Sequence, residues 1–272
     1  MVTGIVTGEH ESRKVNQCLR TLLEATGRFT VKITEEFRGA SYNTLGPYDL
    51  VLINYDGKQW PNDKTAILWG EQSEKALFDF VRSGKGLVIY HSSIWVDPEW
   101  PEEYERMIGG CCCYEAGSRR SPNGDLTVNV VNHTHPITTG LDTSWKTVND
   151  DLFAGSRWHP EAQVEILASV FDDLNDYRTP NFPPAHHPVN IPGDRIENMN
   201  GVDNDQAVAW TNRYGEGRVF VITIGHDQDT IRRHGFVSLF CRGVEWAATG
   251  KVTIQPPSNI GENRLCHWPF YG

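Results

Sequence analysis

The sequence predicts an α/β fold with a mostly parallel sheet and helices on both of its faces. The clearest sign is a continuous apolar run at residues 87–90, which directly follows the glycine-rich turn of residues 84–86. Ahead of that turn, Glu71–Arg82 carries apolar side chains at helical spacing. A helix, a glycine turn and a fully apolar strand are typical of an inner strand of a parallel sheet.

The N-terminal part shows the alternation of strands and helices that such a sheet requires. Residues 4–7 are predicted as the first strand, and residues 13–26 as an amphipathic helix with its apolar side chains on one face. Short apolar stretches predict two further strands at residues 29–33 and 49–54. Connections of this length imply right-handed crossovers between parallel strands.

Beyond residue 97 the pattern loosens, but several elements are still indicated. A short helix is predicted at Glu102–Ile108 and a longer one at about residues 235–248. Strands are predicted for the remaining apolar stretches: residues 126–131, 164–170, 207–211 and 218–224, the last two as a β-hairpin.

Two segments stand apart from this pattern. Residues 172–205 contain five prolines and little periodicity, and so long a loop in a compact domain is usually a lid, a binding loop or disordered. We therefore predict one domain over residues 1–250 with a loop insertion at residues 172–206. The C-terminal tail, residues 251–272, is expected to pack on the domain or on a partner, such as a second copy in a homo-oligomer.

The composition indicates an acidic globular protein and argues against several function classes. A formal net charge of −10 and a pI near 5.4 disfavour a nucleic-acid-binding surface. No apolar run approaches the roughly 20 residues that span a bilayer, and the N-terminus lacks a signal-peptide pattern. The six cysteines show no C-x-x-C spacing, which favours reduced thiols and a cytoplasmic location. We expect a small-molecule partner, and neither a nucleic acid nor a membrane.

Histidines follow three of the predicted strands. His91 ends the central apolar strand, His10 follows the first strand, and His226 follows the second strand of the hairpin. Because ligands of open α/β sheets bind beyond the carboxyl ends of the strands, these imidazoles are expected to gather at one edge. Ser92 and Trp95 come directly after His91. The sequence therefore predicts a site centred on His91.

Short motifs occur in order along most of the chain. They are Val6-Thr7-Gly8 with His10, residues 84–93, residues 132–141 with His135-Pro136 and Gly140-Leu141, Ala209-Trp210, residues 214–220, Gly225-His226 and Val244-Glu245-Trp246-Ala247. Together they resemble the ThuA-like, or trehalose-utilisation, family over residues 1 to about 250. The resemblance implies a flavodoxin-like fold, like that of class I glutamine amidotransferases. It also implies a role in carbohydrate metabolism, beside sugar dehydrogenases that form 3-keto-glycosides.

The chain departs from its implied relatives at the turn after the central strand. Glutamine amidotransferases place a nucleophilic cysteine there, whereas this chain has Tyr90-His91-Ser92 and no cysteine on the turn. Glutamine hydrolysis is therefore disfavoured. Ser92 can replace the thiol as nucleophile with His10 or His226 as its base, although the G-x-S-x-G pattern is absent. The insertion at residues 172–206 is also longer than the usual connection in the family.

Two kinds of chemistry suit the histidines. In the first, His91, His226, Asp151 and His10 carry out general acid–base catalysis on a sugar that contains a carbonyl group. Asp150 and Asp151 match an acidic pair of the family, and either can orient an imidazole or act as a base, or simply cap or solvate a loop. In the second, His10, His91 and His226 hold a divalent metal, Zn²⁺ or Mn²⁺.

Substrate contacts are predicted for residues near these histidines and in the long loop: Trp95, Ser92, Glu9, His186 and His187. These residues can also be explained without a substrate, since Trp95 can pack in the core and the loop histidines can face solvent. The expected function is hydrolysis, elimination or isomerisation of a sugar or a 3-keto-glycoside. A non-catalytic sugar-binding or regulatory protein is an alternative, and so is an amidotransferase-like hydrolase that uses Ser92.

Overall fold

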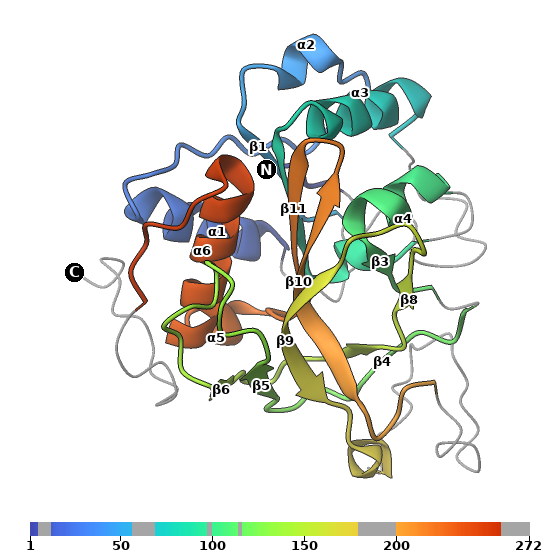
Figure 1. Ribbon diagram of the computed structural model, residues 1–272, viewed down its shortest axis with the longest axis vertical. Helices are drawn as coiled ribbons and strands as arrows, with labels where there is room; N and C mark the ends of the chain where they lie inside the picture. Colours follow the sequence, from blue (N-terminus) through green and yellow to red (C-terminus); the bar gives the residue numbers. More distant parts are fainter. Residues whose placement is uncertain (5–11, 56–68, 97–99, 114–115, 179–199, 257–272) are drawn as a thin grey trace.

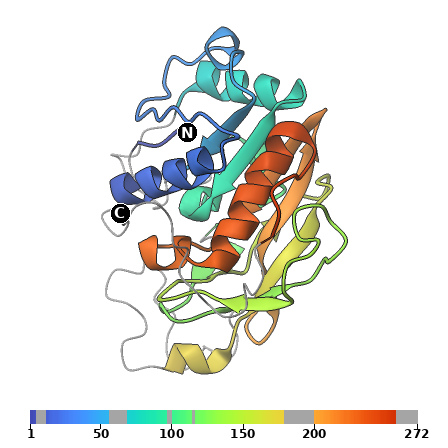
Figure 2. The same cartoon turned by 90° about the vertical axis from the view of Figure 1, so that its left-hand side faces the viewer.

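A seven-stranded sheet runs through the molecule, with helices on both of its faces (Figures 1 and 2). The computed structural model describes residues 1–4, 12–55, 69–96, 100–113, 116–178 and 200–256. The strands stand in the spatial order β1 (Leu50–Ile53), β2 (Gly86–Tyr90), β11 (Gly217–Ile222), β10 (Asp205–Tyr214), β9 (Glu165–Phe171), β5 (Thr127–Val130) and β6 (Ser144–Lys146). The predicted α/β class with helices on both faces of the sheet is confirmed, but the sheet is mixed instead of mostly parallel.

The sheet has a parallel side and an antiparallel side. β1, β2 and β11 run parallel, whereas β10, β9, β5 and β6 continue the sheet in antiparallel pairs. The change occurs at the β10–β11 hairpin, which was predicted at residues 207–211 and 218–224 and is confirmed. A tight turn of this kind joins only antiparallel strands, whereas a parallel pair needs a long crossover.

Alternation along the buried strands decides which helices cover which face. The helices are α1 (Ser12–Ala25), α2 (Tyr42–Leu45), α3 (Glu71–Arg82), α4 (Glu102–Ile108), α5 (Gln228–Ile231) and α6 (His234–Thr249). Leu87 and Ile89 of β2 share one hydrophobic core with α3 and α4. Val88 and Tyr90 point the other way and share a second core with α1 and α6. The period of two along a strand therefore places β2 between two apolar layers.

Smaller elements flank the sheet and carry residues that matter below. They are the ladders of β3 (Gly110–Cys111) with β8 (Arg157–Trp158) and of β4 (Arg119–Arg120) with β7 (Phe153–Ala154), and the 3₁₀ helices η1 (His91–Ile94) and η3 (Leu174–Arg178). Because η1 begins where β2 ends, the chain turns sharply at His91.

Some predicted elements differ from the structure. Residues 29–33 form no strand, because the backbone N–H of Val31 donates to a carboxylate oxygen of Glu24 at 3.1 Å instead of to a neighbouring strand. Directly after this segment, Thr34 makes an isolated parallel bridge to Val2. Most of the strand predicted at residues 4–7 lies outside the described residues. Within the predicted insertion, η3 and the start of β10 at Asp205 are ordered elements, and residues 179–199 lie outside the described part.

The start of the tail packs on α6. The Glu245 carboxylate accepts the backbone N–H groups of Thr253 and Ile254 at 2.8 and 2.9 Å, and Arg242 donates to the Ile254 carbonyl at 2.7 Å. The rest of the tail, residues 257–272, lies outside the described residues.

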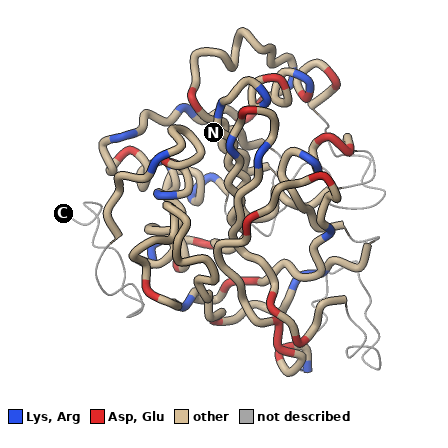
Figure 3. Tube along the Cα trace, in the orientation of Figure 1, with Lys and Arg blue, Asp and Glu red and all other residues tan. Residues whose placement is uncertain are grey.

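Basic and acidic side chains are interspersed along the described trace (Figure 3). In the same part of the chain, no helix combines the length and the apolar character that crossing a membrane requires.

Candidate functional site

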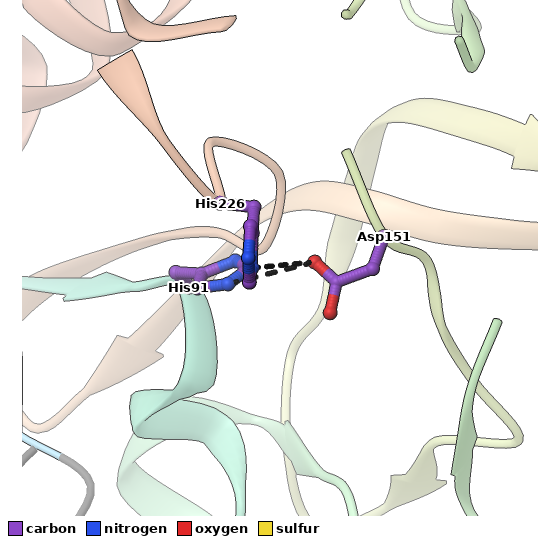
Figure 4. A group of neighbouring side chains, drawn as sticks. All are labelled: His91, Asp151 and His226. Atoms are coloured by element: carbon purple, nitrogen blue, oxygen red, sulfur yellow. Dashed lines mark ion pairs between the residues drawn. The ribbon is translucent and has the colours of Figure 1, made fainter. Parts of the chain in front are cut away.

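Three side chains from separate segments meet beyond the carboxyl ends of β2 and β11 (Figure 4). Oδ1 of Asp151 lies 3.6 Å from Nε2 of His91 and 3.4 Å from Nδ1 of His226. The two imidazole rings meet edge to face, with their centroids 5.5 Å apart. This is the edge at which an open α/β sheet binds its ligands.

The position of His91 results from the sharp turn at the end of β2. Its backbone adopts a left-handed conformation with φ of 48°, which is unfavourable for a residue with a side chain and is found preferentially at functional sites. The ring is buried, and Nδ1 lies 2.6 Å from the carbonyl oxygen of Thr223. Because a carbonyl only accepts, Nδ1 carries the hydrogen and Nε2 faces Asp151.

The strained position on this turn belongs to His91, and Ser92 is the buried residue after it. Ser92 as a nucleophile stays a prediction, which labelling with a serine-directed covalent probe tests.

The two adjacent aspartates have different roles. Both are fully buried, so the expectation that they solvate a loop is wrong. Asp150 accepts the backbone N–H groups of Gly225, His226 and Asp151 at 2.9, 2.9 and 3.0 Å. The Tyr90 hydroxyl donates to the carbonyl of Gly225. Together these bonds fix the turn that carries His226, so Asp150 is a positioning residue.

Gly225 allows this turn to lie close to β2. Its φ is 110°, and a Cβ atom there would lie 2.8 Å from the Tyr90 hydroxyl oxygen. Only glycine adopts this conformation without strain and also leaves room for Tyr90.

Asp151 is held as a carboxylate by the positive groups around it. Nε of Arg120 lies 2.5 Å from Oδ2, on the side opposite the histidines. Burial alone would raise the pKa of Asp151, but the charges of His91, Arg120 and His226 and a hydrogen bond from His226 lower it well below its usual range. Burial and the charge of Asp151 in turn raise the pKa of Asp150. The site therefore has a permanent negative charge at Asp151.

The pKa of His226 depends on this charge. Burial lowers the pKa, but the hydrogen bond to Asp151 and its charge outweigh burial and raise the pKa above 6.5. A group with a raised folded-state pKa stabilises the fold below its unfolded pKa, and that contribution is lost as the pH rises through the folded value. The carboxylate of Asp151 therefore favours the protonated form of His226.

We expect Asp151→Asn to lower the pKa of His226, since burial and the charge of Arg120 still lower it while the Asp151 carboxylate no longer raises it. The measurement is an NMR titration of the imidazole C–H resonances in buffer that contains a chelator. His135, whose pKa is lowered by burial on another loop, serves as the internal control, and its pKa should be the same in both proteins. An unchanged His226 titration would contradict the pairing.

Aromatic rings form a wall behind the cluster. The ring of Phe153 lies 4.7 Å from that of His91 at 34°, and Trp95 meets Phe153 at 5.7 Å, nearly perpendicular. Trp95 is buried, with 4% of its surface exposed, so it supports this wall as the chain is folded. Its role in stacking on a sugar stays a prediction.

The structure thus brings together three of the four predicted catalytic residues: His91, His226 and Asp151. His10, Glu9, His186 and His187 lie outside the described residues. Arg120 was missed, because an Arg-Arg pair in a polar stretch gives no local sign of a site. Only the β4–β7 ladder, in which Arg120 pairs with Phe153, brings it beside Asp151.

The cluster can transfer protons or hold a cation. Its ligand atoms, one each from His91, Asp151 and His226, lie within 4.8 Å of one another. The hydrogen bond from His91 Nδ1 to a carbonyl leaves Nε2 as the ligand atom, an arrangement that is common around metal-bound histidines. The donor set therefore fits Zn²⁺ or Mn²⁺, although Arg120 competes with a cation for Asp151.

Comparison with known proteins places the chain among ThuA-like proteins. The family model for ThuA, trehalose utilisation, matches residues 1–247. A ThuA-like protein from Parabacteroides merdae has a similar structure, with a TM-score of 0.71 and 23% identity over 97% of this chain and 94% of its own. For another, from Bacteroides uniformis, the TM-score is 0.61 and the identity 19%, over 93% and 91%.

A carbohydrate deacetylase shares the fold more distantly. Its TM-score is 0.52 at 10% identity, over 92% of this chain but only 32% of the deacetylase. Among curated proteins no match is found. Because the family model spans residues 1–247 and ThuA-like structures share the fold over nearly the whole length, the chain belongs to the ThuA family, which is described by trehalose utilisation.

Proposed function

We propose that this protein is an enzyme of carbohydrate metabolism that acts on an oxidised, 3-keto glycoside by elimination, hydrolysis or isomerisation. The observation that carries the proposal is the buried pair of imidazoles that share one carboxylate oxygen at the ligand-binding edge of the sheet. Membership of a trehalose-utilisation family supports a sugar as the substrate. The sequence resemblance implies a role beside sugar dehydrogenases that form 3-keto-glycosides, and this is the reason to prefer a keto sugar over other carbonyl compounds.

Elimination illustrates what the two histidines would do. A ketone acidifies the hydrogen on the neighbouring carbon, and the neutral form of His91 removes this proton through Nε2, since Nδ1 donates to a carbonyl. The electron pair of the broken C–H bond forms the C=C bond, and the bond to the glycosidic oxygen breaks. His226, whose protonated form is favoured by the carboxylate of Asp151, transfers its proton to the leaving oxygen. Asp151 stabilises the imidazolium on either side of the step.

The site can also act with a bound divalent metal ion. When bound by His91, Asp151 and His226, such an ion would polarise the keto oxygen. Elemental mass spectrometry of the purified protein separates the two forms. About one equivalent of Zn²⁺ or Mn²⁺, lost in His91→Ala and His226→Ala, assigns a metal centre. A protein that contains none and binds none on titration has the acid–base pair alone.

His226→Ala is expected to lower kcat/KM for 3-keto-glycosides by about 10²- to 10⁴-fold, because the leaving oxygen loses its proton donor. The measurement is product formation from a panel of 3-keto-glycosides and their unoxidised parents. His133→Ala, which removes an exposed histidine, is the matched control and should keep parental activity.

Full activity in His226→Ala would overturn the assigned role. Saturable sugar binding without any product from the panel would favour the alternative of a non-catalytic sugar-binding or regulatory protein.

A further inference from the structure

A pocket that contains none of the three side chains of the histidine cluster is lined by residues of α4 and β8 and by their neighbours in the chain. Its volume of about 470 Å³ falls in the range of roughly 300–1,000 Å³ that is usual for small-molecule sites. The lining combines aromatic and charged side chains: Trp100, Trp158, Glu102, Glu105, Arg157 and His159. None of them belongs to the cluster described above.

Trp158 supplies a rigid aromatic surface. Its indole lies against the backbone of Gly110, where a Cβ atom would be only 2.4 Å from Cε3 of the ring. Trp210 meets the same ring edge-on at 5.2 Å. These contacts fix the orientation of the indole, yet 39% of Trp158 remains exposed. A large, fixed and exposed aromatic surface in a pocket is suited to stacking on the apolar face of a sugar ring.

The charged groups of the pocket are paired with one another. Arg157 donates to both carboxylate oxygens of Glu105, at 2.9 and 2.6 Å. Nε2 of His159 lies 3.6 Å from Oε1 of Glu102. Because Arg157 neutralises Glu105 and Glu102 is exposed to solvent, the pocket offers hydrogen-bond donors and acceptors without a buried unpaired charge. This favours a neutral polyhydroxylated ligand over an ion.

We propose that this pocket binds a neutral pyranose unit, stacked on Trp158 and hydrogen-bonded to the Glu105–Arg157 pair. The pocket also adjoins the wall of the histidine cluster, since Val96 lines it and directly follows Trp95, whose ring packs on Phe153. It is therefore a sugar subsite distinct from the reacting one. The prediction that the pocket binds a sugar depends only on the chemistry of the pocket. The prediction that this binding contributes to turnover rests on the proposed function.

The test is calorimetric titration of the parent and of three variants with trehalose, cellobiose and methyl glucoside. Trp158→Ala should weaken sugar binding by about tenfold or more, whereas Trp158→Phe keeps an aromatic ring and should recover most of the affinity. Phe171→Ala removes a comparably exposed aromatic from β9 and is the matched control, with parental affinity expected. Melting temperatures verify that each variant is folded.

Equal affinity in the parent and in Trp158→Ala, or no binding of any of the three sugars by the parent, would overturn the proposal. The same titration in His226→Ala separates it from the proposed function. Binding that persists in this variant, with turnover abolished, supports both. Binding that persists while the parent turns over no glycoside supports the pocket and removes the catalytic proposal.

Discussion

Asp151→Asn is expected to reduce kcat/KM for the keto-sugar substrate by about 10²- to 10⁴-fold while leaving a folded protein. The carboxylate is fully buried and stands between two imidazoles and the guanidinium of Arg120. An amide of the same shape removes the negative charge that favours the protonated form of His226 and stabilises a proton on His91. Both histidines then become poorer partners in proton transfer.

The measurement is steady-state turnover per folded molecule as a function of pH. In Asp151→Asn the remaining activity should depend on an acid of lower pKa, so its optimum moves towards lower pH. A rate equal to that of the parent at all pH values would rule out Asp151 as part of the machinery.

Asp172→Asn is the matched control for this substitution. Asp172 is also a buried carboxylate, but its partners are the Tyr177 hydroxyl and Arg119, which is the residue before Arg120 in β4 and so points to the other face of the strand. Breaking this pair lowers the free energy of unfolding, since it leaves a buried guanidinium without its counterion. Turnover per folded molecule should remain at the parental level.

Gly217→Ala is expected to lower the free energy of unfolding by about 3 kcal/mol, because the added methyl group meets backbone atoms. Gly217 begins β11 against the C-terminal turn of α3, and a Cβ atom there would lie 2.1 Å from the carbonyl oxygen of Val81. Backbone atoms cannot rotate out of the way as a side chain does, so the hairpin and the helix must separate.

Urea denaturation of the parent and the variant measures this change. Gly124→Ala provides the control, because a Cβ atom at Gly124 meets nothing within 4 Å and its φ is not left-handed. That substitution should change the free energy of unfolding by no more than about 1 kcal/mol in either direction. Equal stability of the two variants would contradict the close approach of Gly217 to α3.

Local patterns were sufficient for the elements that bury their apolar faces fully. The helix at Glu71–Arg82 and the strand at residues 87–90 were predicted nearly to the residue, because a continuous apolar run between a helix and a glycine turn has few alternatives. Residues 29–33 alternate apolar and polar side chains, a pattern that is typical of a strand, yet they form no strand. Their backbone finds a side-chain partner in Glu24, which no periodicity can indicate.

The candidate site shows the same division. The sequence by itself determined that His91 and His226 would meet, because each follows a strand and the ends of neighbouring parallel strands lie at one edge. It also supplied Asp151, although not the different roles of the two adjacent aspartates. Only the tertiary structure decided that Asp150 binds backbone amides, that Arg120 neutralises Asp151, and that Trp158 borders a second pocket. These contacts join segments that are distant in sequence. A local sequence pattern does not indicate which distant segment packs against it, so the contacts could not be predicted.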